Sequence, residues 1–188
     1  DALALIDKVH QFPKNADSLT VSTLTDNRKG VQGQYDVQNR SIQLAEKAIF
    51  PRETLIHEIG HYIDYALIGN DFSATETNKK LDQWRDAVSN SKAYKKLVDM
   101  SFNPDNHTVD YGWATAKPDT KYTSYLMTLN EVWARSYAQY VMTKNGLSSA
   151  FDEVRADQLY GSRQWDDKDF KPILKAFDQL FEELKWKI

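Results

Sequence analysis

Two histidines and a glutamate in one short segment have the residue types and spacing for metal chemistry. His57, Glu58 and His61 form the pattern H-E-x-x-H. On a helix, residues four positions apart lie on one face, with Cβ atoms about 5–6 Å apart. Two imidazole nitrogens at that spacing can bind one Zn²⁺ at about 2.0–2.1 Å. Glu58, rotated toward the open side of such an ion, would accept a proton from a water that the metal activates.

The competing interpretation of this segment is two ordinary core histidines beside a surface glutamate. With four His in the chain, a chance match to the pattern is on the order of one in a few hundred for this length. The context favours the metal site, because apolar residues between Leu55 and Ile63 predict a helix with an apolar back. Pro51 suits the first helical position of that segment, and Gly69-Asn70 ends it.

A catalytic zinc needs a third protein ligand and one open position. Glu131 is the best candidate, because Ala134 and Ala138 share its face of a predicted helix and allow close approach to the first helix. The competing interpretation is a capping box with Thr128, in which the glutamate bonds only to backbone at the helix start. Spacing alone does not choose between the two interpretations.

Three other side chains have ligand chemistry. Asp64 shares the face of the two histidines but is short and lies a turn away. We therefore expect it to accept a hydrogen bond from the free ring N–H of a ligand histidine. His107 lies in a predicted loop and is a weaker candidate ligand, and His10 is expected to be structural.

The sequence pattern around these residues predicts strands first and mostly helices after them, which is an α+β fold. Leu19–Leu24 alternates as a strand, and Gly33–Val37 with Ser41–Leu44 has the pattern of a hairpin. Residues 101–122 are expected to be a long loop. The sequence predicts helices at 2–12, 51–68, 76–100, 129–144, 148–160 and 167–186, the last entered through Asp166 or Asp167 as its cap.

The composition excludes several classes of protein. The chain has 188 residues, which predicts one domain over 1–188, and its 41% apolar content excludes a disordered chain. A net charge of −3 argues against a nucleic-acid binder, and no apolar run is long enough for a membrane span. The absence of Cys excludes thiolate metal sites and Cys nucleophiles. Because the chain begins at Asp1, we expect a mature secreted product or a domain cut from a longer protein.

The segment from His57 to Asp64, with Asn130-Glu131-x-x-Ala134 about seventy positions later, resembles the gluzincin zinc metallopeptidases. Within that class it resembles the anthrax lethal-factor-like peptidases, to which the Pro-Pro endopeptidases are related. The resemblance implies a zincin-like fold, with a small N-terminal mixed β-sheet packed on the active-site helix and a mostly helical C-terminal part. It also implies Zn²⁺ held by His57, His61 and Glu131, with Glu58 as the general base.

The same resemblance implies a tyrosine upstream of the third ligand, whose hydroxyl stabilises the oxyanion of the tetrahedral intermediate. Tyr125 fits best, Tyr122 is the fallback, and the competing interpretation of both is an ordinary packed aromatic. One position departs from the pattern, because Arg135 stands where the family has a second acidic residue. We expect Arg135 to pair with Asp64 or to turn away.

The sequence therefore predicts a zinc-dependent endopeptidase acting on a peptide or protein substrate. An edge strand, expected at Ser41–Leu44, would bind the extended substrate by strand addition. We expect a monomer that is secreted or delivered outside the producing cell. The alternative is a catalytically weak or inactive zincin-fold binding or assembly module of a phage or mobile-element protein, since similar domains occur in phage head proteins and mobile-element polyproteins.

Overall fold

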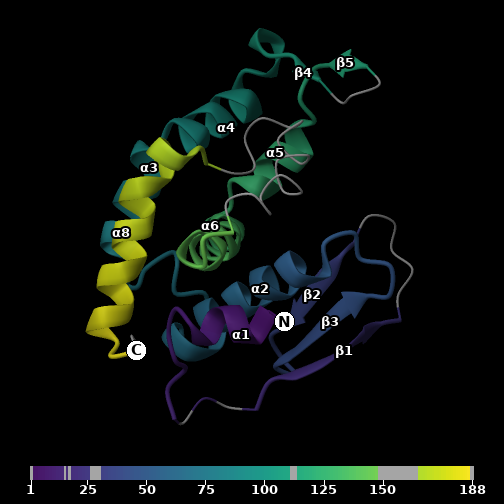
Figure 1. The fold of residues 1–188 in the computed structure, drawn as a ribbon. Coiled ribbons are helices and arrows are strands. Elements are labelled where there is room, and N and C mark those ends of the chain that lie inside the picture. Colours follow the sequence, from purple (N-terminus) through teal and green to yellow (C-terminus); the bar gives the residue numbers. More distant parts are fainter. Residues whose placement is uncertain are drawn as a thin grey trace.

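A small mixed sheet and a larger helical part form the α+β fold that the sequence predicts (Figure 1). The computed structural model describes residues 2–14, 16, 18–25, 31–110, 114–147 and 165–186. The strands are β1 Thr20–Leu24, β2 Gly33–Asp36, β3 Ser41–Ala45, β4 Val109–Asp110 and β5 Thr115–Ala116. The helices are α1 Ala2–Asp7, α2 Pro51–Tyr62, the π-helical turn η1 Ile63–Ile68, the 3-10 turn η2 Lys79–Leu81, α3 Asp82–Asn90, α4 Lys92–Phe102, the 3-10 turn η3 Pro104–Asn106, α5 Thr120–Leu126, α6 Leu129–Lys144 and α8 Asp167–Glu183.

The three-stranded sheet has the order β1-β3-β2. The predicted hairpin is confirmed, because β2 and β3 pair antiparallel with Tyr35 opposite Ile42. The expectation that Ser41–Leu44 forms an edge strand is wrong, since β1 pairs parallel with the other side of β3. A parallel partner approaches from a distant part of the chain, so the local hairpin pattern carried no sign of it. The edge strands of this sheet are β1 and β2.

The predicted helix over 51–68 is continuous but changes its winding near the end. Pro51 starts α2 and Glu53 lies in its first turn, as expected. The last six residues, Ile63–Ile68, form a π-helical turn, a feature found frequently at functional sites. Gly69 follows where a Cβ atom would lie 1.7 Å from the carbonyl oxygen of Phe72, so only glycine fits there.

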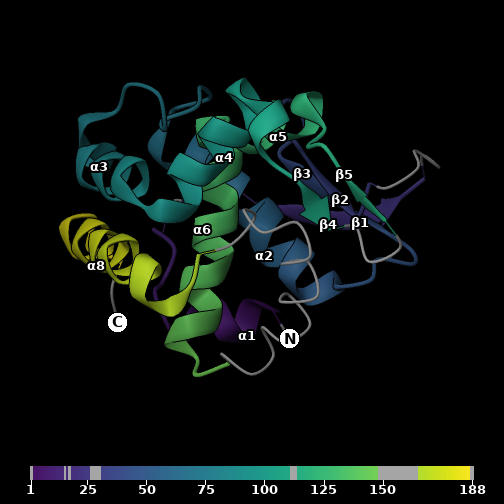
Figure 2. The same cartoon turned by 90° about the horizontal axis from the view of Figure 1, so that it is seen from above.

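Helix α6 runs through the middle of the molecule. Figures 1 and 2 show it between α3 and α8 on one side and α2 with the sheet on the other. Every residue from Glu131 to Met142 is buried, as expected for a helix surrounded by other elements. A Cβ atom on Gly60 of α2 would lie 2.9 Å from Cα of Ala134, so the two backbones are nearly in contact. The indole N–H of Trp133 donates to the carbonyl oxygen of Gly60 at 2.9 Å.

Other predicted elements differ in detail. The helix expected at 76–100 is two helices, because Ser91 leaves the helical conformation and caps α4 through a hydrogen bond from the amide of Tyr94. The expected loop at 101–122 contains η3, the β4–β5 pair and the start of α5. The first helix ends at Asp7, and the helix expected at 148–160 lies outside the described residues. Asp166 caps α8 through the amides of Lys168 and Asp169, as one of the two predicted alternatives.

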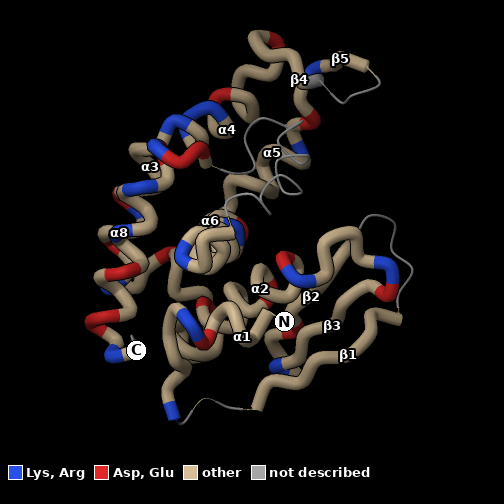
Figure 3. The backbone as a smooth tube through the Cα atoms, viewed as in Figure 1, with Lys and Arg blue, Asp and Glu red and all other residues tan. Residues whose placement is uncertain are grey.

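Lys and Arg residues are interspersed with Asp and Glu residues along the tube in Figure 3, in keeping with the small net charge. Among the described residues, no helix combines the length and the apolar character needed to cross a lipid bilayer.

His10 is a buried structural residue, as the sequence predicts. Its Nε2 lies 2.8 Å from the hydroxyl of Tyr137, and its ring stacks on Phe181 with 4.3 Å between ring centroids. Burial disfavours the charged imidazolium and lowers the pKa of His10 to about 4 from the usual 6.5.

This lowered pKa predicts an acid-sensitive stability. Between pH 6.5 and about 4, His10 binds a proton in the unfolded chain but not in the folded chain. Stability from this group is therefore complete above pH 6.5 and falls by up to about 1.4 kcal/mol per pH unit as the pH drops. Urea unfolding of the wild type and His10→Gln at pH 7 and pH 5 measures the effect. The wild type should lose more stability over this interval than the variant, and equal losses would contradict the assignment.

Candidate functional site

Three side chains from two helices converge at the α2–α6 contact. Nε2 of His57 lies 3.5 Å from Oε1 of Glu131, and Nε2 of His61 lies 3.7 Å from Oε2 of the same carboxylate. One ligand atom from each of these residues lies within 4.8 Å of the others. No second group of three or more His, Asp or Glu side chains with this proximity occurs in the described ranges.

Glu131 faces the histidines instead of capping its own helix. The backbone N–H of Thr128, which a capping box would direct to Glu131, donates to the carbonyl oxygen of Tyr125 at 3.1 Å. The Thr128 hydroxyl donates to the same oxygen at 2.8 Å. Glu131 is only 4% exposed. The capping-box alternative is therefore wrong for this residue.

The charges of the cluster stabilise one another against burial. Burial alone would raise the pKa of Glu131, but His57, His61 and Arg135 hold it well below its usual value. Burial would likewise lower the pKa of His57, and the Glu131 carboxylate raises it instead. Each charged form faces a partner of opposite sign, and for His57 this outweighs the opposing effect of Arg135. These neighbours therefore favour the ionised carboxylate of Glu131, the form that can donate an electron pair.

Glu58 lies on the sheet side of the cluster, 6% exposed. Burial raises the pKa of Glu58, and the two histidines oppose the rise. The backbone N–H of Tyr35 in β2 donates a hydrogen bond to this carboxylate. A Cβ atom on Gly33 would lie 3.0 Å from Oε1 of Glu58 and 2.5 Å from Cγ2 of Thr54, so the strand passes close to the helix. The edge of β2 that pairs with no other strand therefore borders Glu58.

Sequence reasoning did not identify β2 as part of the site. A glycine inside a strand often marks a close approach of another group, so Gly33 carried a usable signal. No sequence pattern indicates the hydrogen bond from Tyr35, because the donor is a backbone N–H and the contact depends on how the sheet packs against α2.

Tyr125 lies at the outer side of the cluster. Its hydroxyl donates to Oε2 of Glu131 at 2.6 Å, and the residue is 53% exposed. Burial of the hydroxyl and the neighbouring Glu131 carboxylate raise the pKa of Tyr125, so it stays a protonated hydrogen-bond donor. Tyr122, the fallback, has its ring centroid 6.3 Å from that of Tyr125. The structure thus brings Tyr125 into direct contact with the cluster.

Asp64 is fully buried, but its described hydrogen bonds run to a neighbouring loop instead of to a histidine ring. Its two oxygens accept from the Ser73 hydroxyl at 2.8 Å and from the amides of Ala74 at 2.6 Å and Thr75 at 3.0 Å. Burial raises the pKa of Asp64, and these hydrogen bonds and His61 oppose the rise. Asp64 therefore fastens the segment after η1 beneath the site.

His107 does not belong to this group of three residues, and its Nε2 lies 2.7 Å from a carboxylate oxygen of Asp99.

Arg135 follows neither expectation from the sequence. It does not pair with Asp64 and does not turn away. Its Nε lies 3.6 Å from Oε1 of Glu131, and its NH2 group donates to the carbonyl oxygen of Leu126. The physical reason is its position four residues after Glu131 on one helix face, which favours an ion pair with that carboxylate.

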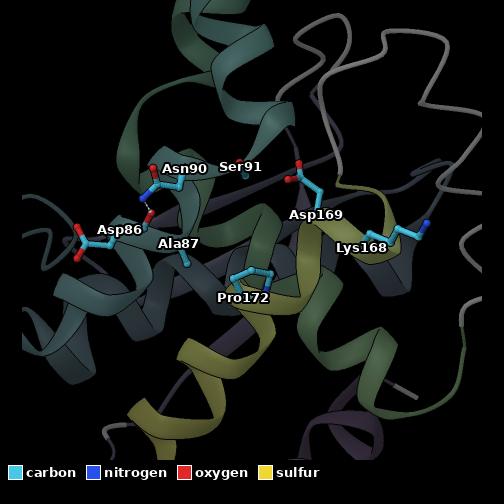
Figure 4. Close-up of a pocket in the computed structure, with 7 residues that line it drawn as sticks. All are labelled: Asp86, Ala87, Asn90, Ser91, Lys168, Asp169 and Pro172. Atoms are coloured by element: carbon cyan, nitrogen blue, oxygen red, sulfur yellow. Dashed lines mark hydrogen bonds between the residues drawn. The ribbon is translucent and has the colours of Figure 1, made fainter.

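Two described cavities lie away from these residues. One, of about 280 Å³, lies between the α3–α4 junction and the start of α8 (Figure 4). Its carboxylate Asp169 accepts from the amides of Lys92 and Ala93, both at 2.9 Å, and so caps α4. The other, of about 420 Å³, borders α4 and includes the exposed Phe102. Neither of these two cavities is lined by His57, His61 or Glu131.

Comparison of the chain with protein-family models, with curated proteins and with solved structures gave no match. The chemical meaning of the cluster therefore rests on its own geometry.

The contact between α2 and α6 yields a stability prediction for Gly60→Ala. Alanine in place of a helix-interior glycine ordinarily stabilises by about 0.8–1.0 kcal/mol. Here the new methyl group would overlap Ala134, and we expect a loss of about 1–3 kcal/mol from overpacking. Urea unfolding measures the change, with the exposed Gln83→Ala in α3 as a control expected within about 0.5 kcal/mol of wild type. A more stable Gly60→Ala protein would show that the helices are not in close contact.

Proposed function

We propose that this chain is a zinc-dependent endopeptidase of the gluzincin type. The observation that carries the proposal is the approach of both His57 and His61 ring nitrogens to the two oxygens of Glu131, at 3.5 and 3.7 Å. These distances exceed those of ordinary hydrogen bonds. They are close to the roughly 3.3 Å expected between two ligand atoms of a tetrahedral zinc with bonds of about 2.0–2.1 Å.

The donor set also fits zinc. Two imidazoles and one carboxylate are a known catalytic zinc set, and such sites leave the fourth position open. His57, His61 and Glu131 would hold the ion. When bound, zinc would polarise a water molecule and the scissile carbonyl.

Glu58 and Tyr125 supply the other expected parts of the reaction. Glu58 follows His57 directly on α2 and is 6% exposed, so its carboxylate lies beside the proposed metal ligands, where a general base is needed. It would take the proton of the attacking water and deliver it to the leaving amine. The hydroxyl of Tyr125, bonded to Glu131 at 2.6 Å, would turn to donate to the oxyanion that develops on the substrate.

The substrate strand is reassigned from β3 to β2. Strand addition needs a free edge, and β3 has partners on both sides. The outer edge of β2 is next to Glu58, where the amide of Tyr35 already donates to a carboxylate oxygen. An extended peptide on this edge would pass beside Glu58, which would accept the proton of the water that attacks the scissile carbonyl.

The test of this function is Glu58→Gln, with Glu53→Gln in the first turn of α2 as the matched control. We expect both variants to bind one zinc ion, because neither residue is a proposed ligand. Hydrolysis should fall by about 10²–10⁴-fold in Glu58→Gln and stay near wild type in Glu53→Gln. Activity is measured on a mixed peptide library by mass spectrometry, with and without a chelator. Undiminished cleavage by Glu58→Gln would refute the mechanism.

The second candidate is a binding or assembly module with the same metal cluster. The observation that favours it is Arg135, a cation 3.6 Å from the proposed third ligand. The same digest separates the two functions, since a module predicts zinc binding by the wild type without chelator-sensitive cleavage of any peptide.

A further inference from the structure

Arg135 joins two parts of the site through one side chain. It is 6% exposed and belongs to α6, one turn after Glu131. Its Nε lies 3.6 Å from Oε1 of Glu131. Its NH2 group donates to the carbonyl oxygen of Leu126, the last residue of α5. Leu126 is next in sequence to Tyr125, so the guanidinium contacts both the proposed third ligand and the segment that carries the hydroxyl.

A fixed aromatic ring backs the guanidinium. The Cζ atom of Arg135 lies 5.9 Å from the ring centroid of Trp165, within the range of a cation–π contact. Trp165 is held in turn by backbone hydrogen bonds with the Gln139 side chain, at 2.8 and 3.2 Å. Its indole N–H donates to the Ser91 hydroxyl at 2.9 Å. This buried network keeps Arg135 facing the α5–α6 corner.

We propose that Arg135 is a positioning residue, which sets Glu131 and Tyr125 at their places beside the two histidines before any metal binds. This inference rests on the proposed function for its catalytic meaning. Two effects of Arg135 on a bound cation oppose each other. Its positive charge repels the metal, while its hold on Glu131 keeps the ligand oxygens in place. Loss of a group that orients a metal ligand typically costs 10–100-fold in metal affinity, and we expect this effect to exceed the repulsion.

Two substitutions separate position from charge. Arg135→Met removes both the hold and the repulsion, whereas Arg135→Lys keeps the charge but cannot reach Glu131 and Leu126 together, because an ammonium lacks the planar fork of a guanidinium. The order of zinc affinity should therefore be wild type, then Arg135→Met, then Arg135→Lys. Arg135→Met should bind zinc about tenfold or more weakly than wild type.

The control is Arg85→Met. Arg85 on α3 likewise donates to two backbone carbonyls, those of Thr75 and Asn78, and pairs with the carboxylate of Asp82. We expect this variant to lose stability to a similar degree but to keep the zinc affinity of the wild type. Zinc dissociation constants are measured by competition with a chromophoric chelator. Zinc binding by Arg135→Met as tight as wild type, or tighter, would overturn the proposal.

A measurement on the metal-free protein keeps this proposal separate from the function itself. Tyrosines labelled with ¹³C at Cε give NMR signals, and Tyr125→Phe assigns the signal of Tyr125. That signal should shift in Arg135→Met and Arg135→Lys and stay in place in Arg85→Met. An unmoved signal in both Arg135 variants would refute the positioning role.

If the wild type binds no zinc, the proposed function fails, and the Tyr125 signal still tests whether Arg135 positions this residue. If Arg135→Met does not fold, Arg135→Lys decides alone.

Discussion

The close contact of α2 and α6 at Gly60 and Ala134 is the constraint on which the site depends. At this separation the carboxylate of Glu131 on α6 reaches the imidazoles of His57 and His61 on α2. The indole of Trp133 strengthens the contact by donating to the Gly60 carbonyl, while the buried length of α6 anchors it among its neighbours. A glycine in the middle of a helix costs stability relative to alanine, and here it allows two helices to bring His57, His61 and Glu131 together.

The site buries several charges that would be unfavourable singly. Glu131 lies between two histidines and Arg135, and Glu58 is held by a backbone amide of β2. Removal of one charged residue from such a group leaves the charge of its partner buried and unpaired. This mutual dependence gives the cluster a definite geometry in the folded chain, which is the property that a metal site with an open position requires.

Local patterns predicted much of this arrangement. The spacing of His57 and His61 placed both on one helix face, and the hairpin of β2 and β3 followed from its alternation. The errors concern contacts between distant segments. The pairing of β1 with β3 turned the expected edge into the centre of the sheet, and the approach of β2 to Glu58 depends on how the sheet packs on α2. Arg135 is a third case. It was expected to pair with Asp64 of another segment, and it pairs instead with Glu131, four residues earlier on its own helix.

The most direct test of the account is the metal content of the purified protein, combined with an anomalous-scattering map of its crystals at the zinc edge. The account predicts one zinc ion per chain, bound by the Nε2 atoms of His57 and His61 and by the carboxylate of Glu131 at about 2.0–2.2 Å. A protein that takes up no zinc, or an ion whose third protein neighbour is Asp64 or His107, would contradict it.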